Sequence, residues 1–237
     1  MKNKLLDKTI KVLDKGYVTL IDSMGSDLSF VNSAKASFAK QSNSLDEAEI
    51  RLLKFLAREN HLSPFRHAFM TFEFKAPLMV ARQHWKYIVG SDHTMDSWNE
   101  GSRRYVTQEP EFYIPAGDEW RSTPENKKQG SGPAINIEAG AEWTRQLEQY
   151  CTLGESHYKA AMEAGLAAEQ ARLFLPAYGM YVNYRWSCSF QSLILFLNQR
   201  LEEDSQKEIQ EYAKAAYLLA KDIYPVSLEL LLNKDLI

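Results

Sequence analysis

Residues 70–89 read MTFEFKAPLMVARQHWKYIV, and two hydrophobic periods meet within this stretch. Its first residues alternate between apolar and polar, with Met70, Phe72 and Phe74 on one face, which is the period-two pattern of a half-buried strand. Pro77 then predicts the first turn of a helix, where its missing N–H costs least. On that helix we expect an apolar stripe of Leu78, Ala81, Trp85 and Ile88, with Gln83 and Lys86 on a different face. The stretch therefore predicts a strand that leads directly into an amphipathic helix.

The rest of the chain predicts few strands and many helices. A strand is expected over residues 17–22, with a turn over residues 24–27. Helices are expected over residues 46–58, 136–165 and 169–175, from Ser189 onward, and in the segment that ends before Pro225. Capping boxes, in which a serine and a glutamate three residues later bond to the backbone, are expected at Ser44–Glu47 and Ser205–Glu208.

These elements predict an α+β fold. We expect one domain over residues 1–237, in which helices, several of them long, pack with a central sheet in mixed layers. A length of 237 residues is sufficient to bury a full core. Residues 115–134 contain three prolines and three glycines and are expected to form an exposed, flexible loop.

Composition argues against several classes of partner. Lys and Arg total 28 against 31 for Asp and Glu, a net charge of -3, so the strong basic excess of nucleic-acid binders is missing. The N-terminal residues are interrupted by charge, and no run approaches the roughly 18 apolar residues of a membrane span. We therefore expect no nucleic acid, no membrane and a cytoplasmic location.

Motifs of several common enzyme classes are missing from the sequence. Cys151 and Cys188 are far apart, without a CxxC pair, so each is expected in the core rather than in a disulfide or a zinc site. The five histidines show no HExxH or comparable spacing, so no metal site is expected. No GxGxxG follows a strand, and neither GxxxxGK[ST] nor GxSxG occurs, which argues against Rossmann, P-loop and α/β-hydrolase sites.

The densest polar stretch is SWNEGSRRY, residues 97–105. Gly and Ser let backbone N–H groups approach a phosphate, and Arg offers it a bidentate fork. Glu100 could accept from a donor on the same ligand. The alternative is a capped surface turn with scattered ion pairs.

Two further arginines lie in apolar stretches. Arg172 follows Ala171 and precedes Leu173 and Phe174, and Arg200 ends the segment LILFLNQR. A buried guanidinium must be paired or bound to a ligand, because an isolated buried ion is too costly. The alternative is that either side chain reaches solvent at a helix end.

At residues 99–105 the sequence reads NEGSRRY, which resembles the N-E-x-S-x-R-Y signature of the flavin-dependent thymidylate synthases. The similarity continues in the same order nearly from end to end. Matching segments are residues 13–18, 21–28, 34–38, 61–67, 75–83, 111–115, 171–176, 196–200 and 208–213.

This resemblance implies a homotetramer with active sites between subunits, in bacterial or virus-infected host cytosol. It implies the FAD-dependent reductive methylation of dUMP to dTMP, with methylenetetrahydrofolate as one-carbon donor and NADPH as reductant. The reduced flavin then carries the hydride and the one-carbon unit, so no cysteine nucleophile is needed. An arginine near the pyrimidine carbonyls would stabilise negative charge that develops on the ring.

The resemblance also implies the site residues. Those that would hold dUMP are Gln83, Glu100, Gly101, Ser102, Arg103, Arg104, Arg172 and Arg200. Those that would hold FAD are Ser37, His61, Ser63, Lys86, Tyr87, Val89, Asn99, Glu100, Ser189 and Gln191. Among these, Arg200, Ser102 and His61 would have catalytic roles.

The flavin half departs from the family pattern. The family's Arg-His-Arg triplet falls on Lys86-Tyr87-Ile88, and residues 91–96 are an insertion. Arg66 stands where many members have an acidic residue, Gln191 where they often have Arg, and Asp204 where some have His.

Two explanations follow from these departures. The site holds FAD through redistributed contacts, with His93 of the insertion as a candidate, or flavin binding is weakened and the chemistry changed. The second explanation leaves two alternative functions: a related one-carbon transfer to another pyrimidine nucleotide, and a nucleotide-binding pseudoenzyme that has lost its flavin site.

Overall fold

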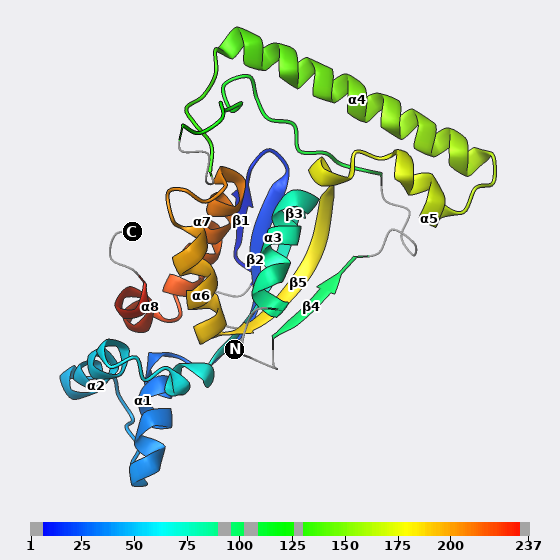
Figure 1. Ribbon diagram of the computed structural model, residues 1–237. Helices are drawn as coiled ribbons and strands as arrows, with labels where there is room; N and C mark the ends of the chain where they lie inside the picture. Colours follow the sequence, from blue (N-terminus) through cyan, green and yellow to red (C-terminus); the bar gives the residue numbers. More distant parts are fainter. Residues whose placement is uncertain (1–6, 90–95, 102–108, 126–129, 233–237) are drawn as a thin grey trace.

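The computed structural model describes residues 7–89, 96–101, 109–125 and 130–232 (Figure 1). These residues form a five-stranded antiparallel sheet in the order β1-β2-β3-β5-β4. Its strands are β1 (Thr9–Val12), β2 (Gly16–Met24), β3 (Phe69–Pro77), β4 (Ser97–Glu100) and β5 (Tyr181–Ser189). The α+β fold expected from the sequence is confirmed.

The helices are of very different lengths. The α-helices are α1 (Asp27–Lys35), α2 (Glu47–Arg58), α3 (Leu78–Val89), α4 (Ile137–Glu163), α5 (Ala168–Ala171), α6 (Phe190–Arg200), α7 (Lys207–Lys221) and α8 (Pro225–Leu231). Short 3-10 helices are η1 (Ala36–Phe38), η2 (Ser63–Arg66), η3 (Arg172–Phe174) and η4 (Ala177–Gly179). Within the described ranges, no helix is long and apolar enough to cross a bilayer.

The central strands bury one face of the sheet. Phe72 and Phe74 of β3 are buried, whereas the residues between them are only partly covered, so the period-two pattern of this strand is confirmed. Tyr184 and Trp186 lie opposite them on β5 and are also buried. Helices α3, α6 and α7 cover this face (Figure 1).

A second lobe brings together helices from the N-terminal and C-terminal parts of the chain. The rings of Phe30, Phe65, Phe190 and Tyr224 pack at centroid distances of 4.9–6.2 Å and connect α1, η2, α6 and the start of α8. The buried carboxylate of Asp27 accepts from the backbone N–H groups of Val226 (3.1 Å) and Ser227 (2.8 Å). These bonds satisfy otherwise unpaired donors at the first turn of α8.

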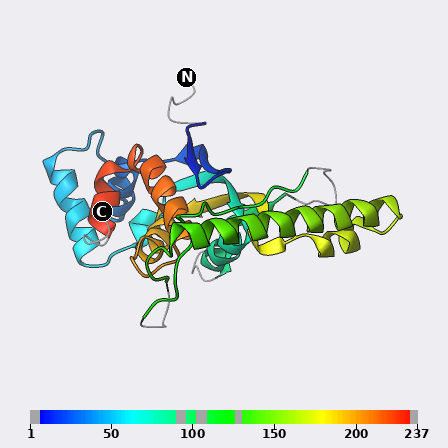
Figure 2. The same ribbon diagram turned by 90° about the horizontal axis from the view of Figure 1, so that it is seen from above.

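Helix α4 forms an arm that projects from the body of the molecule (Figures 1 and 2). Its 27 residues span about 40 Å at 1.5 Å per residue. The arm is fixed at its base, where a Cβ on Gly140 would lie 1.8 Å from the Gly117 carbonyl oxygen, so only glycine allows this approach. Large apolar side chains are exposed along the arm and its return: Ile137, Trp143, Tyr150, Leu153, Met162, Leu166, Leu173, Phe174 and Tyr178.

The sequence located the helices better than their caps. Helix α2 is capped by Asp46, which accepts from the Ala48 and Glu49 N–H groups, so the capping box expected at Ser44–Glu47 is wrong. The box expected at Ser205–Glu208 is also wrong, because the Ser205 hydroxyl donates to the Gln199 carbonyl (2.8 Å) and the Glu208 carboxylate pairs with Arg121. In both cases a better partner is available than the one three residues away.

Two other expectations need comment. Of the apolar stripe expected on α3, Ala81 is buried and Leu78 packs against the core, but Trp85 is wrong: it is 43% exposed, and His84 is buried instead. Part of residues 115–134 is tied to the body of the molecule: Arg121 pairs with Glu208, and Trp120 Nε1 donates to Thr144 (2.9 Å). The flexibility of this segment stays a prediction.

His84 is an imidazole enclosed by rings. Its Nδ1 lies 3.0 Å from the Tyr184 hydroxyl, its ring stacks on Phe196 at a centroid distance of 4.4 Å, and the Trp186 ring packs edge-to-face with it, also at a centroid distance of 4.4 Å. Burial lowers the pKa of His84 to about 3 from an ordinary value of 6.5. The side chain is therefore neutral in the folded protein at physiological pH.

This burial predicts an acid-sensitive fold. The unfolded chain binds a proton at His84 near pH 6.5 and the folded chain only near pH 3, so stability rises with pH across that window, by at most ~1.4 kcal/mol per pH unit. His84→Phe keeps the ring packing and removes this proton. The melting temperature of the variant should fall less than that of the wild type between pH 7.5 and pH 5; equal losses would contradict the prediction.

Candidate functional site

The C-terminal turns of α3 and α6 meet at a half-buried arginine. Arg200 Nε donates to the Tyr87 hydroxyl (2.7 Å), and the Arg200 Cζ lies 5.4 Å from the centroid of the Tyr87 ring. The same hydroxyl donates to Gln199 Oε1 (2.8 Å). Gln83 lies one helical turn before Tyr87 and so occupies the same side of α3. Two of the residues expected to bind nucleotide, Gln83 and Arg200, are thus brought to one place.

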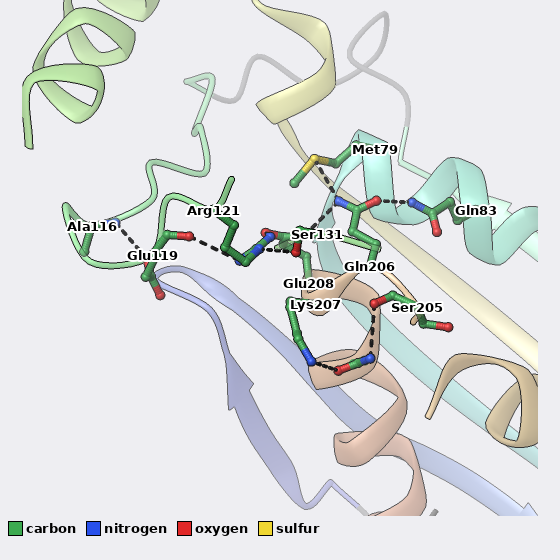
Figure 3. Close-up of polar contacts among 11 residues, drawn as sticks. Met79, Gln83, Ala116, Glu119, Arg121, Ser131, Ser205, Gln206, Lys207 and Glu208 are labelled. Carbon is green, nitrogen blue, oxygen red and sulfur yellow. Dashed lines mark hydrogen bonds and ion pairs between the residues drawn. The ribbon is translucent and has the colours of Figure 1, made fainter. Parts of the chain in front are cut away.

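A chain of polar contacts, from Arg121 through Glu208 and Gln206, holds the side chain of Gln83 in place (Figure 3). Arg121 forms an ion pair with the buried Glu208, whose second oxygen accepts from Gln206 Nε2 at 2.8 Å. Because a carboxylate only accepts, the amide group of Gln206 must face it, and the Gln206 carbonyl therefore accepts from Gln83 Nε2. Among the described residues, the Gln83 carbonyl oxygen has no hydrogen-bond partner. Burial alone would raise the pKa of Glu208, but the hydrogen bonds from Arg121 and Gln206 hold that pKa below its ordinary value.

This network borders a cavity of about 360 Å³. Its walls combine Met79, Trp120 and Leu147 with the polar groups of Arg121 and Gln206. Sequence reasoning missed this network, because its members come from three distant segments and match no motif. The available signals were Gln83, which the resemblance named, and Glu208, which lies in another segment that resembles the family.

The open edge of the sheet carries the second part of the expected nucleotide site. Strand β4 pairs with β5 so that Glu100 lies opposite Tyr184 and Asn99 opposite Arg185, and the Gly101 N–H donates to the Asn183 carbonyl (2.8 Å). Loss of water raises the pKa of Glu100, while a hydrogen bond from Trp98 and the charge of Arg82 oppose this rise. A cavity of about 100 Å³ lies beside these groups. The expected residues Ser102, Arg103 and Arg104 lie outside the described part of the chain.

Several expected flavin residues lie on the lobe of α1, α2 and η2. Ser37, His61 and Ser63 are exposed there. At the end of η2, Arg66 Nε donates to Gln191 Oε1 (2.8 Å), which joins this lobe to the first turn of α6. Two of the positions that depart from the family pattern, Arg66 and Gln191, therefore contact each other.

The side chains of Ser189 and Asp96 cap the first turn of α6. The Ser189 hydroxyl accepts from the Ser192 N–H (3.1 Å), and the Asp96 carboxylate accepts from the Ser192 hydroxyl (3.1 Å) and the Ser189 N–H (3.3 Å). Asp96 ends the insertion, and the sequence did not indicate this capping role. His93, the other candidate in the insertion, lies outside the described residues.

The remaining expected residues are dispersed. Lys86 is exposed on α3, and Val89 ends that helix. Helix α5, which η3 contacts, lies at the return of the arm and away from α6 (Figure 1). Arg172 on η3 is exposed, and its Nε donates to the Glu169 carbonyl (3.2 Å). The interpretation that this arginine reaches solvent is correct within one chain, and Arg200 instead has a partner. A single chain therefore does not bring all expected residues together.

Other chemistries find little support in the described residues. Cys151 and Cys188 are buried as expected, and burial raises the pKa of both thiols, which keeps them protonated. No group of three or more His, Cys, Asp or Glu side chains there could hold a metal ion. The site thus combines guanidinium groups, amides, hydroxyls and carboxylates, a set that suits an anionic, planar, hydrogen-bonding ligand.

Comparison with known proteins identifies the family. Residues 19–226 match the family model Thy1, described as thymidylate synthase complementing protein. A flavin-dependent thymidylate synthase of Thermotoga neapolitana is 37% identical over 223 residues, which are 93% of this chain and 92% of the relative. Another, of Thermus thermophilus, is 35% identical over 219 residues, 92% of this chain and 76% of the relative.

Solved structures agree with this. The UMP/dUMP methylase PolB of Streptomyces cacaoi, bound with 5-Br UMP, has a TM-score of 0.79 and 26% identity, over 93% of this chain and 95% of PolB. The same enzyme bound with 5-Br dUMP has a TM-score of 0.78 and 28% identity. With a family match over most of its length and relatives above 30% identity, the chain belongs to the flavin-dependent thymidylate synthase family.

Proposed function

We propose that this protein catalyses the flavin-dependent methylation of dUMP to dTMP. The observation that carries the proposal is the half-buried guanidinium of Arg200, held by Tyr87, which lies one helical turn from Gln83, in a chain of this family. Relatives carry the thymidylate synthase activity in their names, and the similar solved structures are of a UMP/dUMP methylase with brominated nucleotides bound.

Arg200 would act on the pyrimidine ring. Its Nε is committed to Tyr87, and among the described residues its two terminal nitrogens have no hydrogen-bond partner. They form a planar edge of N–H donors that can bond to a carbonyl oxygen of a uracil. In this position the guanidinium would stabilise negative charge that develops on the pyrimidine carbonyls when the ring is attacked. Glu100, Gly101 and the following Ser102, Arg103 and Arg104 would bind the ribose and phosphate.

FAD is the flavin we propose, and the donor set fits it. A dinucleotide needs hydroxyl and N–H donors together with positive charge for two phosphates. Ser37, His61 and Ser63 supply exposed polar groups, and Arg66 supplies a cation beside Gln191. The Asp96 carboxylate occupies the first turn of α6, so the phosphates would rely on Arg66 and Lys86 rather than on that helix end.

The other proposed flavin contacts come from Val89, Asn99, Glu100, Ser189 and Gln191. When bound, a reduced flavin supplies the hydride and passes on the one-carbon unit. Among the residues of the chain, His61 and Ser102 would orient the reacting groups. The explanation of redistributed contacts is thereby favoured over a lost flavin site, because a cation is retained next to Gln191.

Methylenetetrahydrofolate and NADPH are the proposed co-substrates. The methylene carbon is at the oxidation level of formaldehyde, so its conversion to a methyl group needs two electrons, which NADPH would provide. Both proposals rest on the family resemblance.

A homotetramer would complete the site. Arg172 lies on the return of the arm, away from Arg200, and the arm exposes many large apolar side chains that a second chain could bury. Contact between copies would bring Arg172 of one chain to the nucleotide of another.

A second candidate function is methylation of UMP. The structurally similar PolB is described as acting on both UMP and dUMP, and both carry the same uracil ring. The affinities for dUMP and UMP, measured by the same titration, distinguish the two substrates. A pseudoenzyme would bind either nucleotide without binding FAD.

The first test of the proposal is flavin binding. The purified protein should carry FAD or take it up, with absorption at the usual flavin bands. At a free FAD concentration of 100 Kd the fold should gain about 2.7 kcal/mol, which is easily seen as a rise in melting temperature. If micromolar FAD neither co-purifies nor shifts the melting temperature, the proposed function is wrong.

The second test concerns the cysteines. Replacing both Cys151 and Cys188 with Ala should leave dTMP formation within about tenfold of the wild type, because neither thiol is an activated nucleophile. Removal of a covalent nucleophile instead costs many orders of magnitude. Near-complete loss of turnover in a folded double variant, judged by its melting curve, would contradict the flavin-dependent route.

The third test separates nucleotide from flavin. Arg200→Ala should weaken dUMP binding by about 1.5–3 kcal/mol, roughly 10- to 150-fold, because a charge-assisted hydrogen bond is lost. FAD affinity should stay within about twofold. Separate titrations of the two ligands measure both numbers, and a selective loss of FAD would place Arg200 on the wrong side of the site.

A further inference from the structure

Tyr87 stands where the family carries the histidine of its Arg-His-Arg triplet, yet its side chain points into the protein. It is 6% exposed, and the ring of Phe196 packs edge-on against it at 5.2 Å. A group so covered is poorly placed to contact a bound flavin directly. Its polar contacts among the described residues are with Gln199 and Arg200.

The direction of these two hydrogen bonds is fixed by chemistry. A guanidinium can only donate, so the Tyr87 oxygen must accept from Arg200 Nε. The single hydroxyl proton then goes to Gln199 Oε1, which accepts it at 2.8 Å. Burial raises the pKa of Tyr87, opposed by the Arg200 charge, so the hydroxyl stays protonated and keeps both roles.

These contacts restrict the arginine in two ways. The hydrogen bond at Nε sets the direction of the guanidinium, and the Tyr87 ring, 5.4 Å from Cζ, limits where its plane can move. Because Nε is taken, the two terminal nitrogens are the donors that Arg200 can still offer to a ligand. An arginine side chain held in one rotamer loses less entropy when it binds a ligand.

We propose that Tyr87 is a positioning residue, which holds the Arg200 guanidinium with its two terminal nitrogens directed at the pyrimidine of the bound nucleotide. This inference rests on the proposed function, since it takes Arg200 as the contact to the base. It assigns Tyr87 to the nucleotide side of the site rather than to the flavin side. The departure from the family triplet then changes how the base is held.

The test uses the full-length protein and two separate titrations, with dUMP and with FAD. Tyr87→Phe removes only the hydroxyl and should weaken dUMP binding about tenfold, with FAD affinity changed less than twofold. The matched control is Tyr224→Phe, another buried tyrosine, whose hydroxyl donates to the carbonyls of Met24 and Phe69 instead. This control should leave dUMP affinity unchanged.

A double-mutant cycle with Arg200→Ala provides the decisive measurement. If Tyr87 acts through Arg200, Tyr87→Phe should have almost no further effect on dUMP binding once Arg200 is Ala. Additive losses, an unchanged dUMP affinity in Tyr87→Phe, or a loss confined to FAD would each overturn the inference. If Arg200→Ala itself leaves dUMP binding intact, the proposed function fails first, and the two failures are thereby distinguished.

Gln199→Leu gives an independent route if Tyr87→Phe folds poorly. It keeps the Tyr87 ring and Arg200 and releases the hydroxyl proton from its acceptor. We expect dUMP affinity to fall about threefold with FAD affinity unchanged. A loss of both affinities together would indicate a general structural effect and contradict the positioning role.

Discussion

The antiparallel pairing of β3 with β5 determines where the functional groups of this chain meet. Helix α3 follows directly from β3 and helix α6 from β5, so the register of Phe69 against Ser189 and of Pro77 against Tyr181 fixes the starting point of both helices. The two helices run back across the same buried face, which is filled by aromatic rings. A shift of this pairing by one residue would turn the rings to the other face and separate the two helix ends.

Much of this frame could be predicted from the sequence. The alternation at Met70, Phe72 and Phe74 identified the central strand because period-two burial is a local property of the chain. The long helix that begins after Asn136 was also identified, because the sequence pattern of a helix is likewise a local property of the chain. Burial of His84 could not be predicted, because it depends on rings supplied by β5 and α6, which are remote in the sequence.

The candidate site was predictable only as a set of residues. The resemblance named Gln83 and Arg200, but the contacts that orient them come from Gln206 and Tyr87. Tyr87 and Arg200 are 113 residues apart, so no local pattern indicates their hydrogen bond. The caps of α2 and α7 were also not predicted: Asp46 caps α2, whereas at α7 the Ser205 hydroxyl and the Glu208 carboxylate bond to Gln199 and Arg121, which are not the partners of a capping box.

The hydrogen bonds between Asp27 and α8 have a consequence for folding during synthesis on the ribosome. The N–H groups that bond to the Asp27 carboxylate are about 200 positions later in the chain, so they are synthesised long after Asp27. Phe30 likewise lacks its neighbours Phe190 and Tyr224 until nearly the whole sequence has been translated. The N-terminal lobe must therefore remain incomplete, with apolar surface uncovered, throughout most of synthesis, and its final closure is a late, post-translational event.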